Sequence, residues 1–325
     1  MKNKSIQSTA VKDGADGKRL GVRRRLSLRR AWPIYLMMVP GMVYFIINNY
    51  LPMYGITIAF RKLDFALGVF NSPFNGLDNF KFLFSQGAVI TAIRNTVLYN
   101  GVFIVIGTVL AIAVAILLNE VVSRVAQRFY QTAILLPHLM SMVVVSYLVF
   151  AFLSADTGFI NKSLIEPLTD SYINFYQERK YWPFILLFVN QWKTIGFSTI
   201  IYYSSIIGIS SEYYDAAKVD GATKWKQIRY ITLPMLKPLV ITMFILSVSR
   251  IFASDFGLFY QIPKNSGTLY PITQTIDVYV YNMLMNQNNI SMSSAASVFQ
   301  SIVGFFMVIG ANALIRKIDR ENALF

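Results

Sequence analysis

The sequence has no cysteine and a single histidine, His138, among its 325 residues. Without a thiol the chain can form no disulfide, thiolate zinc site or iron–sulfur cluster, and it has no cysteine nucleophile. One histidine leaves little for a histidine-based metal site or for the catalytic centre of an intramembrane enzyme. The sequence also lacks the G-x-x-x-x-G-K-[ST] pattern of a P-loop. We therefore expect no metal, no cofactor and no catalytic site in this chain.

Charge is scarce as well. Charged residues make up 14% of the chain and hydrophobic residues 55%, whereas a typical soluble domain has about 25% charged residues. The mean hydropathy is +0.48. This composition indicates an integral membrane protein. The formal net charge of +14 would suit a nucleic-acid partner, but the placement of the charges along the chain argues against one.

Six apolar runs are long enough to cross a bilayer, which takes about 20 residues. They lie at residues 31–52, 93–119, 129–153, 182–209, 239–260 and 295–315. We therefore predict an all-α membrane protein with six transmembrane helices. Its parts would be a basic N-terminal tail (1–30), a membrane domain (31–316) and a short C-terminal tail (317–325).

Lysine and arginine residues predict the orientation. Twenty of the 30 lie in the two tails and in the links between runs two and three and between runs four and five, and nine lie on the opposite side. The termini and these links should therefore be cytoplasmic, where the excess charge also meets anionic lipid rather than nucleic acid. The first run is too long for a signal peptide and is expected to stay as an anchor. The segments 53–92, 154–181 and 261–294 would be external, either as connectors or as a docking surface.

The link between runs four and five is the longest polar one and reads EYYDAAKVDGATKWKQIRYITLPMLKP. Ala217 and Gly221 are four residues apart and would share one face of a helix. Gly221 also permits a tight turn that divides the link into two short helices. Pro234 and Pro238 predict a fresh helix start near Pro234 for the fifth span. Read from its residues alone, the link is an interfacial amphipathic helix, a helix-turn-helix or a docking helix, and the flanking spans disfavour the second of these.

The stretch DAAKVDGATKWKQIRYITLPMLKP resembles the EAA motif of permease subunits in ABC importers, E-A-A-x-x-x-G-A followed by I-x-L-P. Asp215 stands for the usual glutamate, which keeps the charge and shortens the reach. The residues that match are Ala216, Ala217, Gly221, Ala222, Ile231, Leu233 and Pro234. The sequences DGA and P-x-x-x-P within the stretch look like the carbohydrate-importer branch.

The likeness extends over about Ser27–Phe325. LLPHLMSMVVVSYL, DFGLFYQIPKNSGTLYPITQTIDVYVY and RKIDRENALF resemble permeases for oligosaccharides from plant or algal polysaccharides, including the aldouronate and alginate types. The resemblance implies the type I ABC importer permease fold in a bacterial inner membrane. It implies a second homologous permease, two ATP-binding subunits that bind ATP and Mg, and an extracellular solute-binding protein as partners.

In that family the EAA segment forms coupling helices that seat in a groove of the ATP-binding subunit. We carry this role to residues 210–234, called here the EAA-like segment. The residues to which the resemblance gives the coupling role are Glu212, Asp215, Ala216, Ala217, Asp220, Gly221, Ala222 and Trp225.

Polar residues inside the spans are candidates for the substrate path. Arg250 and Asp255 would lie in the fifth span about 140° apart around the helix, too far for a direct pair. Arg250 would bind a sugar hydroxyl or a uronate carboxylate, or else pair with another span. Asn190, Gln191 and Trp192, with Lys193 nearby, would bind sugars or hold helices together.

Several alternatives stay open. A secondary transporter would need inverted repeats and buried acidic relays, which are not evident. An ABC importer for another solute, such as an amino acid or phosphate, is disfavoured by DGA. Among sugars, an acidic oligosaccharide such as a uronate or alginate fragment is expected, with neutral pectic or xylan fragments as the alternative. His138, beside Pro137, is expected to pack at a kinked helix.

Overall fold

The structure is a computed structural model that describes residues 28–318. Within this range it is helical, and its only β-pairing is an isolated bridge between Arg61 and Phe74. The predicted tails lie outside the described residues, except where α1 and α15 begin and end. The chain forms two compact units, residues 1–54 and 55–325, which are described separately.

The first unit contains one apolar helical run. It consists of α1 (Leu28–Phe45), a π-helical turn (Ile46–Tyr50) and α2 (Leu51–Met53). The residues at both junctions keep right-handed helical dihedral angles, so the backbone continues without a break. The predicted first span therefore exists as a helix.

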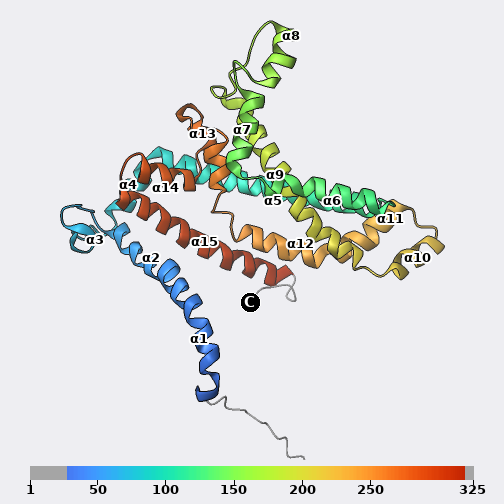
Figure 1. Cartoon of the computed structure of the whole chain (residues 1–325), viewed down its shortest axis with the longest axis horizontal. Coiled ribbons are helices and arrows are strands. Elements are labelled where there is room, and N and C mark those ends of the chain that lie inside the picture. The colour runs from blue at the N-terminus through green and yellow to red at the C-terminus, as the bar shows by residue number, and fades with distance from the viewer. Residues whose placement is uncertain (1–27, 319–325) are drawn as a thin grey trace, which may run out of the picture. The chain divides into compact units, whose positions relative to one another are not determined.

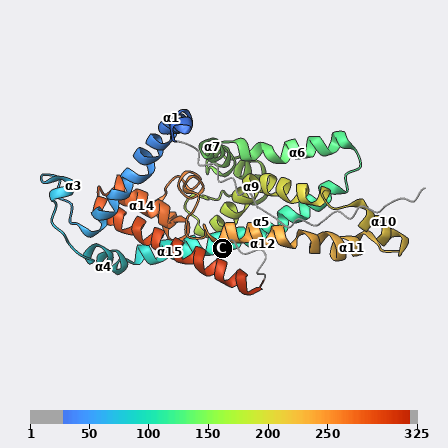
Figure 2. The ribbon, with the colours of Figure 1, turned by 90° about the horizontal axis from the view of Figure 1, so that it is seen from below.

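The second unit holds the remaining helices (Figure 1). The longer helices are α5 (Gly87–Asn119), α6 (Arg124–Leu139), α7 (Met142–Leu153), α9 (Trp182–Ile207), α12 (Leu233–Val248) and α15 (Ile290–Ile318). The shorter ones are α3 (Gly68–Asn71), α4 (Asp78–Ser85), α8 (Glu166–Thr169), α10 (Ser211–Val219), α11 (Lys224–Gln227), α13 (Tyr270–Thr273) and α14 (Ile276–Met285). Helices α10 and α11 lie at one end of this unit, and α4 and α14 lie at the other (Figures 1 and 2).

Five helical runs in the described residues are long and apolar enough to cross a membrane, and a bent pair makes a sixth if it is counted as one span. This agrees with six predicted spans. Helices α5, α9 and α15 match the second, fourth and sixth runs closely. The third and fifth runs differ from the prediction.

The third predicted span is not one helix. Helices α6 and α7 meet at 96°. The Ser141 side chain accepts a hydrogen bond from the Val144 amide and so caps a new helix rather than extending the old one. Pro137 lies in the last turn of α6. The His138 ring stacks on Phe197 of α9, with centroids 5.1 Å apart, which confirms its packing role at a bend.

The fifth predicted span was misplaced along the chain. The helix runs without interruption from Lys224 to Val248 and does not start afresh near Pro234. Pro234 and Pro238 supply no amide hydrogen to the helical ladder. A π-helical turn, Ile228–Thr232, precedes Pro234, and the Leu233 amide reaches back to the Ile228 carbonyl. The helix ends at Val248, so residues 249–256 are not part of it.

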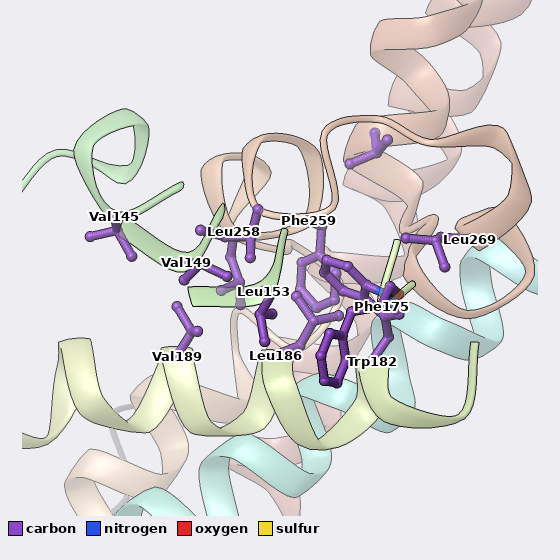
Figure 3. Close-up of a cluster of buried hydrophobic side chains, with 12 residues drawn as sticks. Val145, Val149, Leu153, Phe175, Trp182, Leu186, Val189, Leu258, Phe259 and Leu269 are labelled. Carbon is purple, nitrogen blue, oxygen red and sulfur yellow. The ribbon is translucent and has the colours of Figure 1, made fainter. Parts of the chain in front are cut away.

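The largest buried cluster joins α7, the first half of α9 and a π-helical turn at Gly257–Gln261 (Figure 3). Trp182, Leu186 and Leu258 are fully buried there. A second cluster, which includes Ala111, Ala115 and Leu236, joins α5, the second half of α9 and α12. The long helices α5 and α9 therefore connect two separately packed cores.

Candidate functional site

The EAA-like segment folds as two short helices, α10 and α11, joined by a turn at residues 220–223. We call α10, this turn and α11 the corner. Helix α10 ends at Val219, and Gly221 takes a φ of +73°. The Ala222 amide donates to the Ala217 carbonyl at 2.8 Å, and the Gly221 amide donates to the Lys218 carbonyl at 3.0 Å. These two bonds define a Schellman motif, the usual glycine-dependent end of a helix. Ala217 and Ala222 are therefore five residues apart because the Schellman hydrogen bond at the end of a helix joins residues with this separation.

This geometry changes the role expected for Gly221. We predicted that it shares a helix face with Ala217, but Gly221 lies beyond the end of α10. The alternative expectation, a turn that divides the segment into two helices, is confirmed. Glycine is required here because a side chain disfavours the left-handed conformation. A Cβ added at Gly221 would meet no atom within 4 Å, so the restriction comes from the backbone and not from space.

Three side-chain contacts attach the corner to the membrane helices. The Tyr214 hydroxyl lies 2.9 Å from the Thr232 hydroxyl. Buried Gln227 donates to the Ala222 carbonyl at 3.1 Å. Lys224 forms a 2.9 Å ion pair with Glu120, directly after the end of α5. The corner is thereby held to both α5 and α12.

The opposite side of the corner is open. Val219 is 89% exposed and Trp225 is 68% exposed. Glu212, Asp215, Ala216, Asp220 and Gly221 are exposed as well, and Ala217 and Ala222 are half-buried. Asp215 pairs with Lys218 at 2.8 Å on the surface. Exposed apolar side chains ringed by charge are typical of an interaction surface.

A polar cavity of about 230 Å³ lies among α5, α9 and the end of α12. Its lining is mostly amide and hydroxyl side chains: Asn100, Thr108, Asn190, Thr194, Ser198 and Ser247, with Arg250. A smaller cavity of about 80 Å³ adjoins it and shares Gly107, Thr108, Ser198 and Ser247. These small polar groups in long apolar helices make a site suited to hydroxylated ligands.

Arg250 and Asn190, two of the residues predicted to line a substrate path, both line this cavity. Arg250 is exposed and lies in the turn directly after α12. Among residues 28–318 its guanidinium has no ion-pair or hydrogen-bond partner in the protein. A free guanidinium beside a polar cavity can bind a carboxylate through two parallel hydrogen bonds.

The two remaining candidates on α9 point elsewhere. Gln191 is buried against α5, where its amide donates to the Phe103 carbonyl at 3.3 Å and packs on Gly107. Trp192 lines an apolar groove between α7 and α9. Successive helical residues differ by about 100°, so Asn190, Gln191 and Trp192 face three directions. Only the first is positioned to meet a ligand in the cavity.

The side chains of Asp255 and Lys193 form hydrogen bonds with backbone groups. Asp255 is not in a span helix: its carboxylate accepts from the Leu258 amide at 3.1 Å and caps the turn that follows. The Lys193 ammonium donates to the carbonyls of Pro137, His138 and Met140 at the end of α6. A cation at a helix C-terminus is stabilised by the helix dipole. Lys193 therefore supports the bend between α6 and α7 and does not face the cavity.

Among the side chains that hold the break after α12, sequence reasoning missed Asp277. Asn100 donates to the carbonyls of Ile251 and Ala253 at 2.8 and 3.1 Å. Asp277 accepts from the Ser254 amide and hydroxyl at 2.6 and 2.7 Å. Asp277 could have been recognised from the sequence as a structural or functional candidate, because it is an acidic residue in a stretch otherwise rich in apolar and tyrosine residues.

The predicted external segments contact one another. Arg179 donates to the Thr268 carbonyl at 2.6 Å and so links residues 154–181 to residues 261–294. The Leu63 amide donates to Ser291 at 3.1 Å and links the first predicted external segment to the last. Burial within the second of these segments raises the pKa of Tyr176 to about 12. The three segments form a joined surface; whether it is external stays a prediction.

Comparison with known proteins gives consistent matches. The family described as binding-protein-dependent transport system inner membrane component matches residues 104–320. The polygalacturonan/rhamnogalacturonan transport system permease protein YteP of Bacillus subtilis is 33% identical over 99% of both chains. A chain of a bacterial ABC transporter for import of the acidic polysaccharide alginate superposes with a TM-score of 0.81 at 30% identity, over 90% of this chain and 98% of that one. The same kind of transporter, in complex with a periplasmic protein bound to an alginate pentasaccharide, superposes with a TM-score of 0.80 at 30% identity, over 90% of this chain and 96% of that one.

Proposed function

The chain belongs to the family of binding-protein-dependent transport system inner membrane components, and on that premise we propose that it is a permease subunit of an ATP-driven importer for oligosaccharides, acidic ones in particular. The chain itself would supply the membrane path. The energy would come from separate ATP-binding subunits that hold ATP and Mg.

The observation that carries this proposal is the EAA-like segment. It presents an exposed, capped corner, and its second half continues as one helix from Lys224 into a membrane-length run. A rigid element that is gripped at one end transmits a rotation along its length. The corner is thus built to pass a partner's movement to α12, and Val219 and Trp225 supply the exposed apolar contacts.

The cavity supports the substrate class. Its amide and hydroxyl groups match the donors and acceptors of a sugar, and Arg250 adds a free positive charge. Among the relatives, YteP is named for transport of polygalacturonan and rhamnogalacturonan, and a solved structure for import of the acidic polysaccharide alginate, whereas others are named for lactose or sn-glycerol-3-phosphate. A carboxylate of an acidic substrate is the group that a free guanidinium recognises best. Neutral oligosaccharides satisfy the rest of the cavity equally well, so Arg250 decides between them.

The partners follow from the same likeness. A second, homologous permease would complete the path, two ATP-binding subunits would grip the coupling corners, and a solute-binding protein would deliver the sugar on the opposite side. The alginate transporter has been seen with a sugar-loaded periplasmic protein. We place this chain in the bacterial inner membrane with both termini cytoplasmic, as its charge distribution predicts.

Transport by the reconstituted complex tests the function. We expect ATP-dependent uptake of alginate or polygalacturonate oligosaccharides, with ATPase activity stimulated by a loaded binding protein. Replacing Arg250 with alanine should lower uptake of acidic oligosaccharides and spare neutral ones. Stimulation by neutral oligosaccharides alone would refute the acidic preference, and uptake driven by an ion gradient without ATP would favour a secondary transporter.

Gly221→Trp tests the coupling role. A Cβ at Gly221 would meet no atom of the chain within 4 Å, so a bulky side chain there leaves the backbone into open space and tests the fit of a partner. Gly221→Ala carries the same backbone cost without the bulk, so the additional loss of binding in the tryptophan variant measures the clash with the partner. We expect the tryptophan variant to insert into the membrane but to lose the ATP-binding subunits on purification. Full retention of those subunits and normal transport would rule out this corner as the docking site.

A further inference from the structure

Two membrane-length runs are broken beside each other. Helix α6 gives way to α7 at a 96° bend, and α12 gives way to the π-helical turn Gly257–Gln261 after residues 249–256. The Met142 side chain fills the space that a Cβ on Gly257 would need. The Ser146 hydroxyl donates to the Gln261 carbonyl at 2.7 Å. The parts beyond the two breaks therefore pack together; we call α7 and residues 256–261 the α7 block (Figure 3).

The part before the second break belongs to another body. Helix α12 packs with α5 and the second half of α9 around Leu236. It is also continuous with α11 and hence with the exposed corner. Along the chain, a movement of the corner is therefore carried to Val248 and then into residues 249–255, while through packing it reaches the α7 block by way of α5 and α9. Only residues 249–255 join the two bodies along this part of the chain.

This joining segment is held by side chains from three other helices. Asn100 of α5 binds two of its carbonyls, and Gln300 of α15 donates to the Phe252 carbonyl at 2.9 Å. Asp277 of α14 accepts from the Ser254 amide and hydroxyl, and its second oxygen accepts from Gln300 at 3.0 Å. Non-helical backbone at membrane depth needs such partners because lipid supplies none.

Asp277 is the centre of this arrangement. Its carboxylate accepts three hydrogen bonds, and it forms no ion pair with a basic residue in the described part of the chain. Hydrogen bonds to an ionised acceptor are short and about twice as strong as neutral ones. Ser254, which it holds, lies four residues after Arg250. The anchor point is therefore immediately beyond the residue that we assign to substrate.

We propose that Asp277 is a positioning residue of transport: it fixes the far end of the break after α12, so that rotation of α12 turns about residues 249–254 and carries Arg250 relative to the cavity. Without the anchor, only Asn100 and Gln300 would hold the joining segment, its end at Ser254 would be released, and part of the rotation would be lost in the loop. Short segments that absorb backbone rotation between two rigid bodies act as hinges. The inference rests on the proposed function, because it needs the corner to be driven by a partner.

The absence of cysteine makes the test direct, since a label pair can be added without removing native thiols. Spin labels at Lys237→Cys on α12 and Met285→Cys on α14 would report the distance across the break. Both positions are exposed. The complex would be purified through this chain and studied in its nucleotide-free and ATP–vanadate states. In the unmodified background we expect two distinct distances.

In the Asp277→Ala background we expect a broadened distance, a lost nucleotide-dependent shift and a fall in alginate-oligosaccharide uptake of about tenfold or more. Basal ATPase activity should stay within about twofold, because the corner is untouched. Ser254→Ala is the matched control: it removes the hydroxyl bonds to Asp277 and Thr275 but keeps the amide hydrogen bond to Asp277, so its shift and uptake should change much less than those of Asp277→Ala. An Asp277→Ala complex with a normal shift and normal uptake would overturn the proposal.

If the complex with Asp277→Ala does not assemble, the variant Asp277→Asn tests the proposal instead. Its amide oxygen still accepts from Ser254, but the charge is gone. We expect a broader distance distribution and reduced uptake, and behaviour identical to the unmodified complex would overturn the proposal. The result is distinct from a failure of the proposed function: an unmodified complex with no ATP-dependent uptake would remove that function, whereas the hinge is judged on the variants of an active complex.

Discussion

Replacing Gly221 with alanine is the sharpest single test of the corner. The φ of Gly221 is +73°, and an L-residue in this region costs about 1–2 kcal/mol relative to glycine. No contact offsets the cost, since a Cβ there meets nothing within 4 Å. A penalty of this size changes the ratio of formed to unformed corner by a factor of about 5 to 30.

The affinity for the ATP-binding subunits should follow that ratio. We assume that the ATP-binding subunits bind only the formed corner and that the corner is mostly unformed in the alanine variant. The apparent dissociation constant then rises by the factor by which the fraction of formed corner falls. We expect a weakening of up to about 30-fold for alanine, and a smaller one for asparagine, which tolerates the left-handed region better. The measurement is titration of labelled, detergent-solubilised permease with purified ATP-binding subunits.

A matched control separates this effect from a general loss of glycine. Gly267 also has open space around its Cβ position but does not have a positive φ. Gly267→Ala should bind the ATP-binding subunits as the unmodified chain does. Two results would refute the reasoning: an alanine variant at Gly221 that docks with unchanged affinity, or an asparagine variant that docks more weakly than the alanine variant.

Three other predictions concern how the helices are held. Gly196→Ala should lower the melting temperature in detergent, because the new Cβ would collide with a backbone carbonyl of α6. The control, Gly304→Ala, places its Cβ in open space on a helix and should be neutral or stabilising by up to about 1 kcal/mol. Equal melting temperatures for the two variants would contradict this prediction. Lys193→Met leaves three carbonyls at the end of α6 without their donor and should destabilise the fold by about 1–3 kcal/mol, with Lys193→Arg retaining more stability in the same assay. The exposed pair between Glu120 and Lys224 should contribute only about 0.2–1 kcal/mol in a double-mutant cycle and less at high salt; a coupling that is larger and insensitive to salt would show that the pair is buried in the working complex.

Local patterns in the sequence predicted the elements that depend on local physics. Long apolar runs predicted α5, α9 and α15 nearly to their ends, because a run of that length has to satisfy its backbone internally. The glycine in DGA predicted the break after α10, because only glycine enters the left-handed region at little cost. The EAA resemblance predicted the family that the comparison then showed.

The errors lie where a side chain from a distant helix decides the backbone. Pro137 indicated a kink near Met140 and Ser141 caps the helix that follows, but these local residues do not specify an angle of 96°. The carbonyls freed at the bend are bound by Lys193, more than fifty residues later. The fifth run looked apolar as far as Tyr260, but its helix ends at Val248. Asn100, Asp277 and Gln300 satisfy the interrupted backbone from three other helices.

The same division applies to the candidate site. The sequence by itself determined the apolar helices, the capped corner and the presence of an arginine and an asparagine within or beside spans, since each follows from residues close along the chain. Only the tertiary structure decided that Arg250 and Asn190 share a cavity while Gln191, Trp192 and Asp255 do not. The reason is geometric: neighbouring residues on a helix point about 100° apart, and only the packing of α5, α9 and α12 settles which direction leads into the cavity.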